Sequence, residues 1–449
     1  MLVRPAWLSM LFFVVLPVWA QDSAAVRLAQ LERKIALLQT EVKALRHQIQ
    51  PAKQPQTVSK KANVPQRTNR YQAAVMTSPT MGLISEYDGR DLIVSYSSMK
   101  QYLKLLNQRQ RFSKDWHDHG LNRPALQLSG GVEGQFQWAD DAAGHTTDID
   151  LSRFELDVLA EVNPWIAAMG SMSYDNGSDA AQDRTKSSNL YLKRGFFVLG
   201  DLSKSPYYAA FGQMYMPFGR YSSYMLSSGI PVSLGRISGR GLVLGYYGLD
   251  QQDNGLSTSV YLMQGKSRPS PANASIDQFG AEASWMHHFQ NGSIQLGAGW
   301  VRNIADADKV EQALRDKTPA AHRLLQQRVA GLDVYAIAGL QDWRMVAEYV
   351  SAMDDIVANS IDYGQYSAMH FELDRNFGTK HWPSNWFLAY DRSIGIKNNL
   401  LNQPRVSWAT GLAFHMWKNT LQAIEFRHKK PYGTGDDEDS LTMQFGLYF

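Results

Sequence analysis

Apolar and polar residues alternate along the chain from residue 125 onward. Between 125 and 138 the apolar side chains share one parity and the polar side chains the other: Leu126, Leu128, Val132, Phe136 and Trp138 against Gln127, Ser129, Glu133, Gln135 and Gln137. Successive side chains of a strand point to opposite faces of a sheet. The alternation therefore predicts strands with one apolar and one polar face.

The same period recurs to the C-terminus in 16 segments, beginning near residues 125, 149, 165, 187, 206, 239, 257, 276, 292, 328, 341, 365, 384, 404, 419 and 438. Connections after even-numbered segments are mostly short, and those after odd-numbered segments are mostly longer. This arrangement is typical of a transmembrane barrel with tight turns at one rim and long loops at the other. We therefore expect an all-β fold: a 16-stranded antiparallel transmembrane β-barrel over residues 125–449. A soluble β-sandwich is the alternative, and the even count and the terminal Phe449 disfavour it.

Residues 1–20 read as a signal peptide. Arg4 supplies the positive charge, Leu8 to Val18 form a short apolar core, and Val18-Trp19-Ala20 resembles a cleavage site. The apolar core is far shorter than the roughly 20 residues of a helical membrane span. We expect an exported protein of the bacterial outer membrane, with its N-terminal arm in the periplasm.

Residues 21–50 are predicted to form a helical coiled coil that associates with other copies, as a possible homotrimer. The apolar positions follow a heptad: Leu28, Leu31, Ile35, Leu38, Val42, Leu45 and Ile49. Residues 51–70 contain three prolines, five Lys or Arg and no acid, which is typical of a disordered basic linker. The alternative for the heptad is a single amphipathic helix packed on another domain.

Residues 71–124 form a small segment whose place, in the periplasm or in the lumen, the sequence leaves open. Ser97 or Ser98 could begin a helix over 99–111 with Leu103 and Leu106 on one face. Such a helix could partly fill the lumen where other receptors carry a plug.

Charge divides the chain into a basic arm and an acidic body. Residues 21–124 hold 17 Lys or Arg and 8 Asp or Glu, whereas residues 125–449 hold 27 basic and 34 acidic residues. An acidic body argues against a uniformly anion-selective channel, so any preference for anions must be local.

No sequence motif for catalysis, metal binding, a cofactor or nucleic-acid binding is present. Cysteine is absent, which excludes a thiol nucleophile, a disulfide and a Cys-ligated metal. His287 and His288 are neighbours in a predicted strand, so they point to opposite faces and cannot share one ion. We expect neither an enzyme nor a metal site.

Parity places a set of charged residues on the lumen face: Glu133, Glu155, Asp157, Glu282, Asp333, Arg344, Glu348, Glu372, Arg405, Glu425 and Arg427. Arg220, Arg236 and Arg240 flank a long predicted outer loop. They could bind carboxylates by paired hydrogen bonds or contact acidic lipopolysaccharide. Arg344, Arg405 and Arg427 could pass an anionic ligand inward.

Several stretches resemble the legiobactin-receptor family of siderophore porins, found in Legionella, Francisella and Coxiella-like bacteria. They are Thr77-Ser78-Pro79-Thr80-Met81-Gly82, Asp91-Leu92-Ile93-Val94, residues 104–110, residues 205–213 and Met216-Pro217-Phe218-Gly219. The resemblance covers about 71–449. It implies outer-membrane uptake of a ferric polycarboxylate siderophore, of the rhizoferrin type, through a barrel without a plug domain.

Three function classes remain open from the sequence. The first is a selective siderophore porin, and the second is a general porin or one selective for another solute. The third is an arm that ties the membrane to the cell wall. A Ton-coupled receptor is disfavoured, since it needs 22 strands and a plug domain.

Overall fold

The computed structural model describes residues 74–77, 125–141, 144–175, 189–250, 252–267, 275–317, 325–378, 382–398, 401, 403–417, 419–433 and 435–449. The predicted signal peptide, coiled coil and basic linker lie outside the described residues. So does the predicted 71–124 segment, apart from the short strand β1 (Ala74–Thr77).

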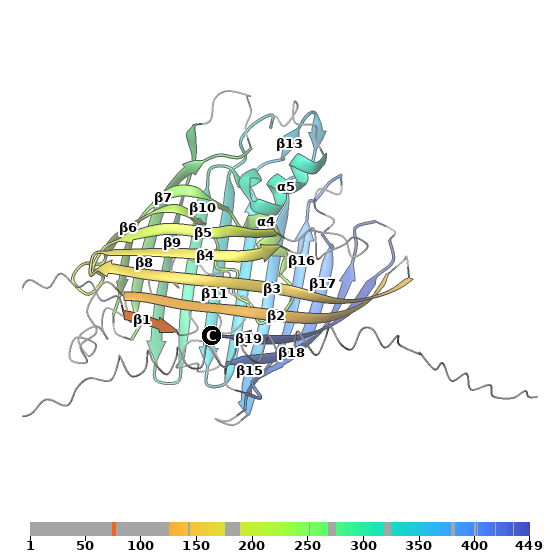
Figure 1. The fold of residues 1–449 in the computed structure, drawn as a ribbon. Coiled ribbons are helices and arrows are strands. Elements are labelled where there is room, and N and C mark those ends of the chain that lie inside the picture. The colour runs from red at the N-terminus through yellow and green to blue at the C-terminus, as the bar shows by residue number, and fades with distance from the viewer. Residues whose placement is uncertain are drawn as a thin grey trace, which may run out of the picture. The chain divides into compact units, whose positions relative to one another are not determined.

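Sixteen long strands of the described residues form one sheet, and most of them can be followed by their labels in Figure 1. They are β2 (Ala125–Asp141), β3 (Gly144–Asn163), β4 (Ile166–Asp175), β5 (Asn189–Leu199), β6 (Tyr207–Tyr215), β7 (Ser238–Leu249), β8 (Gly255–Gln264), β9 (Ile276–Phe289), β10 (Gly292–Val301), β11 (Gly331–Leu340), β12 (Trp343–Ala352), β15 (Ser367–Gly378), β16 (Pro383–Ile394), β17 (Val406–Phe414), β18 (Thr420–Lys430) and β19 (Glu438–Tyr448). Their first residues differ by at most five from the predicted starts.

The sheet closes on itself. Each of these strands pairs with its neighbour along the chain in antiparallel register, and β19 pairs antiparallel with β2, from Asp439–Asp140 to Tyr448–Gly131. Main-chain bonds between Gly130 and Phe449 extend this last ladder. The predicted 16-stranded antiparallel barrel is confirmed. The strand β1 runs parallel to the start of β2, with Ala74 opposite Ala125 and Thr77 opposite Leu128.

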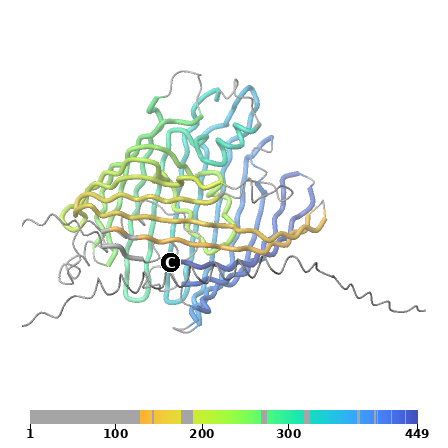
Figure 2. Tube along the Cα trace, in the orientation of Figure 1, coloured from red at the N-terminus to blue at the C-terminus, as the bar shows by residue number. Residues whose placement is uncertain are grey.

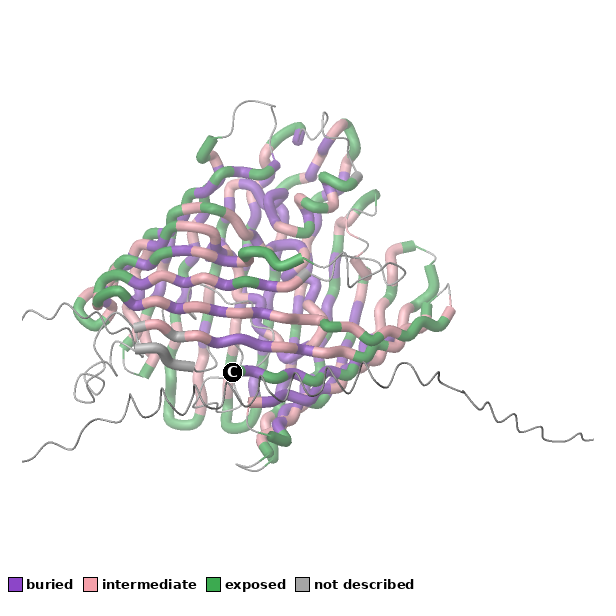
Figure 3. The backbone as a smooth tube through the Cα atoms, viewed as in Figure 1, coloured by how far each residue is buried: buried purple, intermediate pink, exposed green. Residues whose placement is uncertain are grey.

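Side chains alternate between an outer and an inner face of this wall, visible as alternating colours along each strand in Figure 3. Large apolar side chains such as Phe136, Trp285, Trp408 and Phe445 are exposed on the outer face. Polar side chains such as Glu282 are buried on the inner face. Closure leaves no unpaired strand edge, which is what an apolar solvent around the wall requires.

The two rims differ, as predicted. At one rim β9–β10 and β11–β12 are joined by two residues each, and these tight turns are drawn together in Figure 2. The other rim carries the longer connections. These contain α4 (Ile230–Gly235), η2 (Ile304–Asp306), α5 (Asp308–Lys317) and the small hairpin of β13 (Val357–Ala358) and β14 (Ile361–Asp362). Within the described part of the chain, no helix is long and apolar enough to cross a membrane.

Candidate functional site

The connection between β6 and β7, residues 216–237, folds into the barrel and is called the inward loop below. Its main-chain N–H groups donate hydrogen bonds to carboxylates of the inner wall. The Arg220 N–H donates to Glu348 Oε1 on β12 at 2.6 Å, and the Leu226 N–H donates to Glu425 Oε2 on β18 at 2.6 Å. Because both glutamates are buried on the inner face, the loop lies inside the lumen. The sequence pattern predicts an outer loop here, and this prediction is wrong.

Further contacts hold the rest of the inward loop. The Tyr224 N–H donates to Glu372 Oε1 on β15 at 2.8 Å, and the Ile230 N–H donates to Asp391 Oδ1 on β16 at 3.1 Å. On the return path the Tyr366 hydroxyl donates to the Leu234 carbonyl at 3.1 Å. The loop therefore runs along the inner wall from β12 to β18 and back. It narrows the lumen on the side that these strands form.

Tyr221 locks the two ends of the inward loop together. Its backbone has a φ of 50°, and the preceding Gly219 has a φ of 77°. A Cβ on Gly219 or on Gly235 would lie 2.3 Å from an atom of the Tyr221 side chain. Only glycine fits at these two positions, so one buried ring fixes both the entry and the exit of the loop.

His370 joins two of the carboxylates that hold the loop. Its Nδ1 lies 3.0 Å from Asp391 Oδ1, and its Nε2 lies 3.4 Å from Glu372 Oε2. All three side chains are buried. His370 therefore positions both acceptors, one for the Tyr224 N–H and one for the Ile230 N–H.

A second set of charged side chains lies on the wall across the lumen. Three cations, Arg153 on β3 with Lys193 and Arg194 on β5, surround Glu155 and are called the basic cluster below. Lys193 Nζ lies 2.8 Å and Arg153 NH2 lies 3.2 Å from Glu155 Oε2, while Arg194 bonds to Oε1. In the closed order of 16 strands, β5 and β15 are eight strands apart. The basic cluster thus faces the wall that carries the inward loop.

A β-bulge allows neighbouring residues to reach the same carboxylate. In the pairing of β4 with β5, Ser171 lies opposite Arg194, but Met172 lies opposite Leu192. Lys193 is the extra residue, and such an insertion re-aims a side chain. Both Lys193 and Arg194 therefore contact Glu155 on the inner side.

Two of the three cations of the basic cluster, Arg153 and Lys193, are partly exposed, whereas Arg194 and the acid Glu155 are buried. The side chains of Arg153 and Lys193 are 25% and 23% exposed, whereas that of Glu155 is 1% exposed. Glu133, which accepts from Arg153 NH1 at 3.1 Å and from the Tyr448 hydroxyl at 2.8 Å, is also buried. The charged surface of this cluster that solvent reaches is therefore mainly that of Arg153 and Lys193.

Four of the six arginines predicted to bind ligand lie in or at the lumen. Arg220 belongs to the inward loop, and Arg236 stands 3.5 Å from Asp308 with its guanidinium 5.1 Å from the Tyr215 ring centre. Arg344 donates to the Ser222 hydroxyl at 2.5 Å, and Arg427 donates to the Ser228 carbonyl at 3.3 Å. The structure therefore brings Arg220, Arg344 and Arg427 together around the inward loop.

The structure places the other two arginines away from the lumen. Arg240 is exposed and shares its parity on β7 with the outward Leu242 and Leu244. Arg405 precedes β17 and is exposed, although its main chain continues the ladder to Lys430 at 2.7 Å. The alternation alone predicts Arg405 on the inner face. Arg405 lies just outside β17, however, at the rim that carries the long loops.

Sequence reasoning missed Arg153, Lys193 and Arg194. Arg153 could have been found, because it shares its parity with Glu155 two residues later. Lys193 and Arg194 could not both be found, since a regular strand places neighbours on opposite faces and the bulge has no sequence signature.

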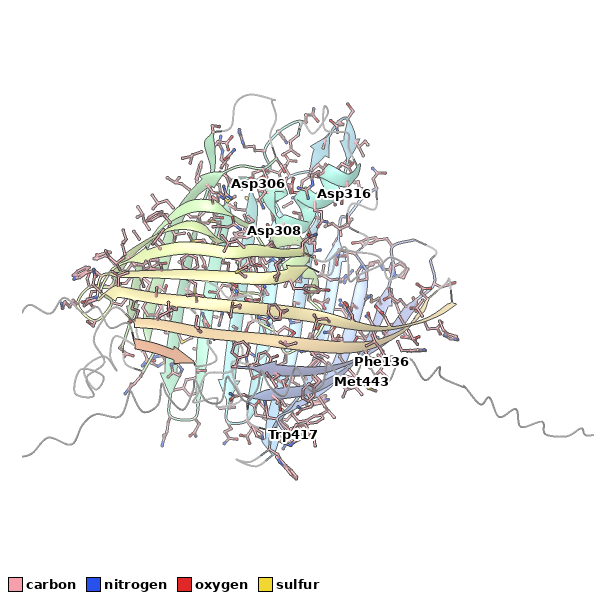
Figure 4. The ribbon with its side chains drawn as sticks, viewed as in Figure 1. Phe136, Asp306, Asp308, Asp316, Trp417 and Met443 are labelled. Carbon is pink, nitrogen blue, oxygen red and sulfur yellow. The ribbon has the colours of Figure 1, made fainter. Side chains whose placement is uncertain are left out.

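At the long-loop rim, acids tie separate connections together; Figure 4 labels Asp306 and Asp308 there. Asp308 accepts from the Ser238 N–H at 2.9 Å and from Lys266 Nζ at 2.9 Å. Asp306 accepts from the main-chain N–H groups of Lys266 at 3.0 Å and Ser267 at 2.6 Å. Burial raises the pKa of Asp306 to about 6, against the lowering effect of these bonds.

Among the residues that the structure describes, no three His, Asp or Glu side chains are placed to hold a metal ion. The inward loop and the basic cluster together make the lumen a narrowed passage with charged walls. It can attract and orient charged solutes.

Comparison with known proteins finds relatives in Coxiella burnetii and Legionella pneumophila. A UPF0422 protein of Coxiella burnetii is 26% identical, with 94% of this chain and 93% of the relative covered. A UPF0422 protein of Legionella pneumophila strain Lens is 28% identical, with 84% of this chain and 76% of the relative covered. No family model matches the chain.

Solved structures with similar chain traces include an outer-membrane channel and a porin. The channel DcaP of Acinetobacter baumannii has a TM-score of 0.49 at 12% identity, covering 72% of this chain and 97% of that one. An anion-selective porin from Comamonas acidovorans has a TM-score of 0.48 at 10% identity, covering 73% and 100%. Likeness at this level carries no argument about function.

Proposed function

We propose that this protein is an outer-membrane porin whose lumen favours small anionic solutes. The exposed apolar outer face and the closed ladder support a place in a membrane. The predicted signal peptide supports export to the outer membrane.

One observation carries the preference for anions: two partly exposed cations surround the buried Glu155, and two acids of the facing wall accept from main-chain N–H groups. Arg153 and Lys193 are partly exposed above the buried Glu155. On the facing wall, Glu348 and Glu425 accept hydrogen bonds from main-chain N–H groups of the inward loop. An acidic body can therefore enclose a passage with a positive surface.

Measuring the reversal potential of purified channels in a planar bilayer, across a KCl gradient, tests this proposal. The wild-type channel should pass chloride in preference to potassium. The double variant Arg153→Gln with Lys193→Gln should lower the permeability ratio about fivefold, which corresponds to roughly 1 kcal/mol.

Arg240→Gln is the matched control, because it removes an exposed cation from the outer face. It should leave the reversal potential unchanged. A cation-selective wild-type channel, or equal ratios in the double variant and the wild type, would contradict the proposal.

For the solute itself, we propose a ferric polycarboxylate siderophore, on the strength of the family resemblance. Arg236 and Arg220 lie where a carboxylate could first bind, and Arg344 and Arg427 lie further along the inward loop. Each contact must stay weak, because a tight site would block release where no energy source acts. The alternative solute class is small anions in general.

Uptake of solutes labelled with radioactive carbon separates the two solute classes. Cells that express the barrel but lack Ton energy coupling receive ferric rhizoferrin or an iron-free polycarboxylate of similar size and charge. Faster entry of the ferric complex supports the siderophore porin. Equal rates support a general anion porin, and uptake that needs Ton contradicts passive diffusion.

Self-association through residues 28–49 also stays a proposal. The heptad supports it, although its mixture of Leu, Ile and Val at position a does not fix the number of strands. Crosslinking of a peptide of residues 21–50 tests it. A peptide that is monomeric and unstructured at high micromolar concentration would contradict it.

A further inference from the structure

The outer face of the barrel carries an apolar recess on β8, β9 and β10, called the outer trough below. Three alanines lie at its centre, Ala281 and Ala283 on β9 and Ala298 on β10. Larger side chains flank them in the same cross-strand row, since Ala281 pairs with Val260 on one side and with Trp300 on the other. The outer trough has a volume of about 710 Å³, which lies within the roughly 300–1,000 Å³ of ordinary ligand sites.

The outer trough opens to the surroundings of the barrel and not to the lumen. Val260 is 54% exposed and Trp300 is 37% exposed, and both alternate with buried side chains of the inner face. Leu244 and Leu332, which extend the same row on β7 and β11, are also exposed. Small side chains therefore leave this part of the outer face recessed, and an apolar group that enters it gains contacts on several sides.

Two arginines lie at the long-loop end of the outer trough. Arg302 directly follows β10, and its guanidinium lies 5.3 Å from the ring centre of Phe279. The Phe279 ring lies in turn 5.7 Å from the ring of Trp300 in the trough wall. Arg328 forms an ion pair with Asp277, and Arg302 NH1 donates to the Asp277 carbonyl at 2.8 Å. A continuous surface therefore joins the two arginines to the trough.

This pair of arginines keeps a positive charge. The carboxylate of Asp277 balances one guanidinium, that of Arg328. The contact of Arg302 with a main-chain carbonyl does not neutralise the other guanidinium. Both arginines are partly exposed. Because guanidinium groups bind phosphate by paired, charge-assisted hydrogen bonds, the end of the trough favours a phosphate group.

The depth of the two features in a membrane suits a lipid. About 9–11 residues of a tilted strand cross the hydrocarbon layer, and β10 has 10 residues, from Gly292 to Val301. Arg302 thus lies at the level where lipid headgroups begin. Ala298 lies four residues deeper, which is roughly 13 Å along the strand. A molecule with a phosphate at one end and an acyl chain below it can contact both features.

We propose that the outer wall binds a phosphorylated lipid of the outer leaflet, with a phosphate at Arg302 and Arg328 and an acyl chain in the outer trough. The positive charge at the end of an apolar recess favours this occupant over the apolar face of a second copy. The inference rests on the proposed place of the barrel in a membrane. It does not depend on which solute passes through the lumen.

Native mass spectrometry of the full-length barrel in detergent measures the binding of lipid directly. The probes are lipid A with two phosphates and the same lipid A after removal of both phosphates. The wild type should bind the phosphorylated probe at least about tenfold more tightly, which is the effect of roughly one charge-assisted hydrogen bond. Equal affinities for the two probes would overturn the proposal.

Substitutions of Arg302 test the phosphate contact. Arg302→Gln should lower the affinity for the phosphorylated probe about tenfold, whereas Arg302→Lys keeps the charge and should retain most of the affinity. Arg375→Gln is the matched control, because Arg375 is an exposed cation that lies 5.1 Å from the Trp343 ring centre, but at the rim of tight turns. It should leave the affinity unchanged. Equal losses in the two glutamine variants would count against a site at Arg302.

A bulky substitution tests the chain contact. Ala281→Trp fills the outer trough and should weaken binding of the phosphorylated probe about fivefold. Ala168→Trp is the control, because it adds the same side chain to the outer face of β4, where Ala168 pairs with the outward Phe197. The heat-dependent shift of the band in gel electrophoresis checks that each variant is folded.

Two outcomes of the trough substitution would overturn the proposal. Unchanged affinity in Ala281→Trp would mean that the acyl chain lies elsewhere. Unchanged affinity together with the loss of oligomers would identify the outer trough as an interface between copies of this chain. The reversal potential of wild-type channels tests the proposed anion passage separately, so either proposal can fail while the other stands.

Discussion

Single carboxylates of the inner wall act here as acceptors for main-chain donors. Glu425 accepts from the N–H groups of Leu226 at 2.6 Å and Ser227 at 3.3 Å, and from the Ser227 hydroxyl. Hydrogen bonds to charged groups contribute roughly 1.5–3 kcal/mol each, about twice the neutral value. A few such residues can therefore hold a loop in a water-filled lumen.

Replacing Glu425 with Gln should loosen the inward loop. The amide keeps one acceptor oxygen but turns an N–H donor toward Ser227 or Leu226, so at least one bond is lost. We expect the open-channel current noise to rise and the unfolding free energy to fall by roughly 1–3 kcal/mol. Single-channel recording and urea titration in vesicles measure the two effects.

Glu438→Gln is the control for this substitution, because it removes the same charge from an ion pair with Lys429 at the rim. It should change neither the noise nor the stability by more than about 1 kcal/mol. Equal noise in the Glu425 and Glu438 variants would show that Glu425 does not hold the loop.

At the scale of elements, the connections of the long-loop rim depend on each other. Asp308 at the start of α5 accepts from Ser238 at the start of β7, and the Asp308 N–H donates to the Arg236 carbonyl at 2.8 Å. The C-terminal end of the inward loop and the first part of the connection after β10 therefore share one set of hydrogen bonds. Movement of either one strains the other.

Asp306 should make this rim sensitive to pH. Its pKa is raised to about 6 by burial, above the ordinary 3.8, so between pH 4 and 6 the folded state binds more protons than the unfolded state. The stability it contributes is present below about pH 4 and is lost as the pH rises through 6. At neutral pH the buried charge costs up to roughly 3 kcal/mol.

Asp306→Asn should remove this dependence, because the amide oxygen can still accept from Lys266 and Ser267. The melting temperature of the variant minus that of the wild type should therefore increase from pH 4 to pH 7. Asp316→Asn on α5 is a control with no such expectation. A difference between variant and wild type that does not change with pH would contradict the role of Asp306.

The strands could be predicted from the sequence, whereas the inward loop could not. Each strand can be recognised from its own residues, because apolar side chains suit lipid and polar side chains suit water, and the two alternate along the strand. The inward loop is held by main-chain donors that every sequence possesses, and its acceptors, such as Glu348 and Glu425, lie more than a hundred residues away. No local signal in residues 216–237 indicates that this connection turns inward. The sequence therefore predicts an outer loop that contains Arg220.

The barrel is a single layer of strands. Each strand therefore presents apolar side chains on the outer face and polar side chains on the inner face. Met443 points outward on β19, where it pairs with Phe136 of β2 and is labelled with it in Figure 4. Its neighbour Gln444 points inward and accepts from Gln135 Nε2 at 2.6 Å. Because the ladder closes, the same strand can place an apolar side chain outside and a polar side chain inside.

Lysine substitutions at these neighbouring positions should separate the two faces. Met443→Lys places a charge in lipid and should lower the unfolding free energy by roughly 2–4 kcal/mol if the residue lies near the bilayer midplane. Gln444→Lys faces the lumen and should cost about 1 kcal/mol for one hydrogen bond. Urea unfolding in lipid vesicles compares them, and equal losses would argue against a membrane around the outer face.

The anchors of the inward loop also set the order in which the molecule can assemble. The Arg220 and Leu226 N–H groups lie 128 and 199 residues before their acceptors, Glu348 and Glu425. Contacts of such long range form late, because the intervening chain must first be ordered. Until β18 joins the sheet, residues 216–237 have only part of their binding surface. The passage therefore reaches its final width near the end of biogenesis, and a barrel arrested before that step would leak.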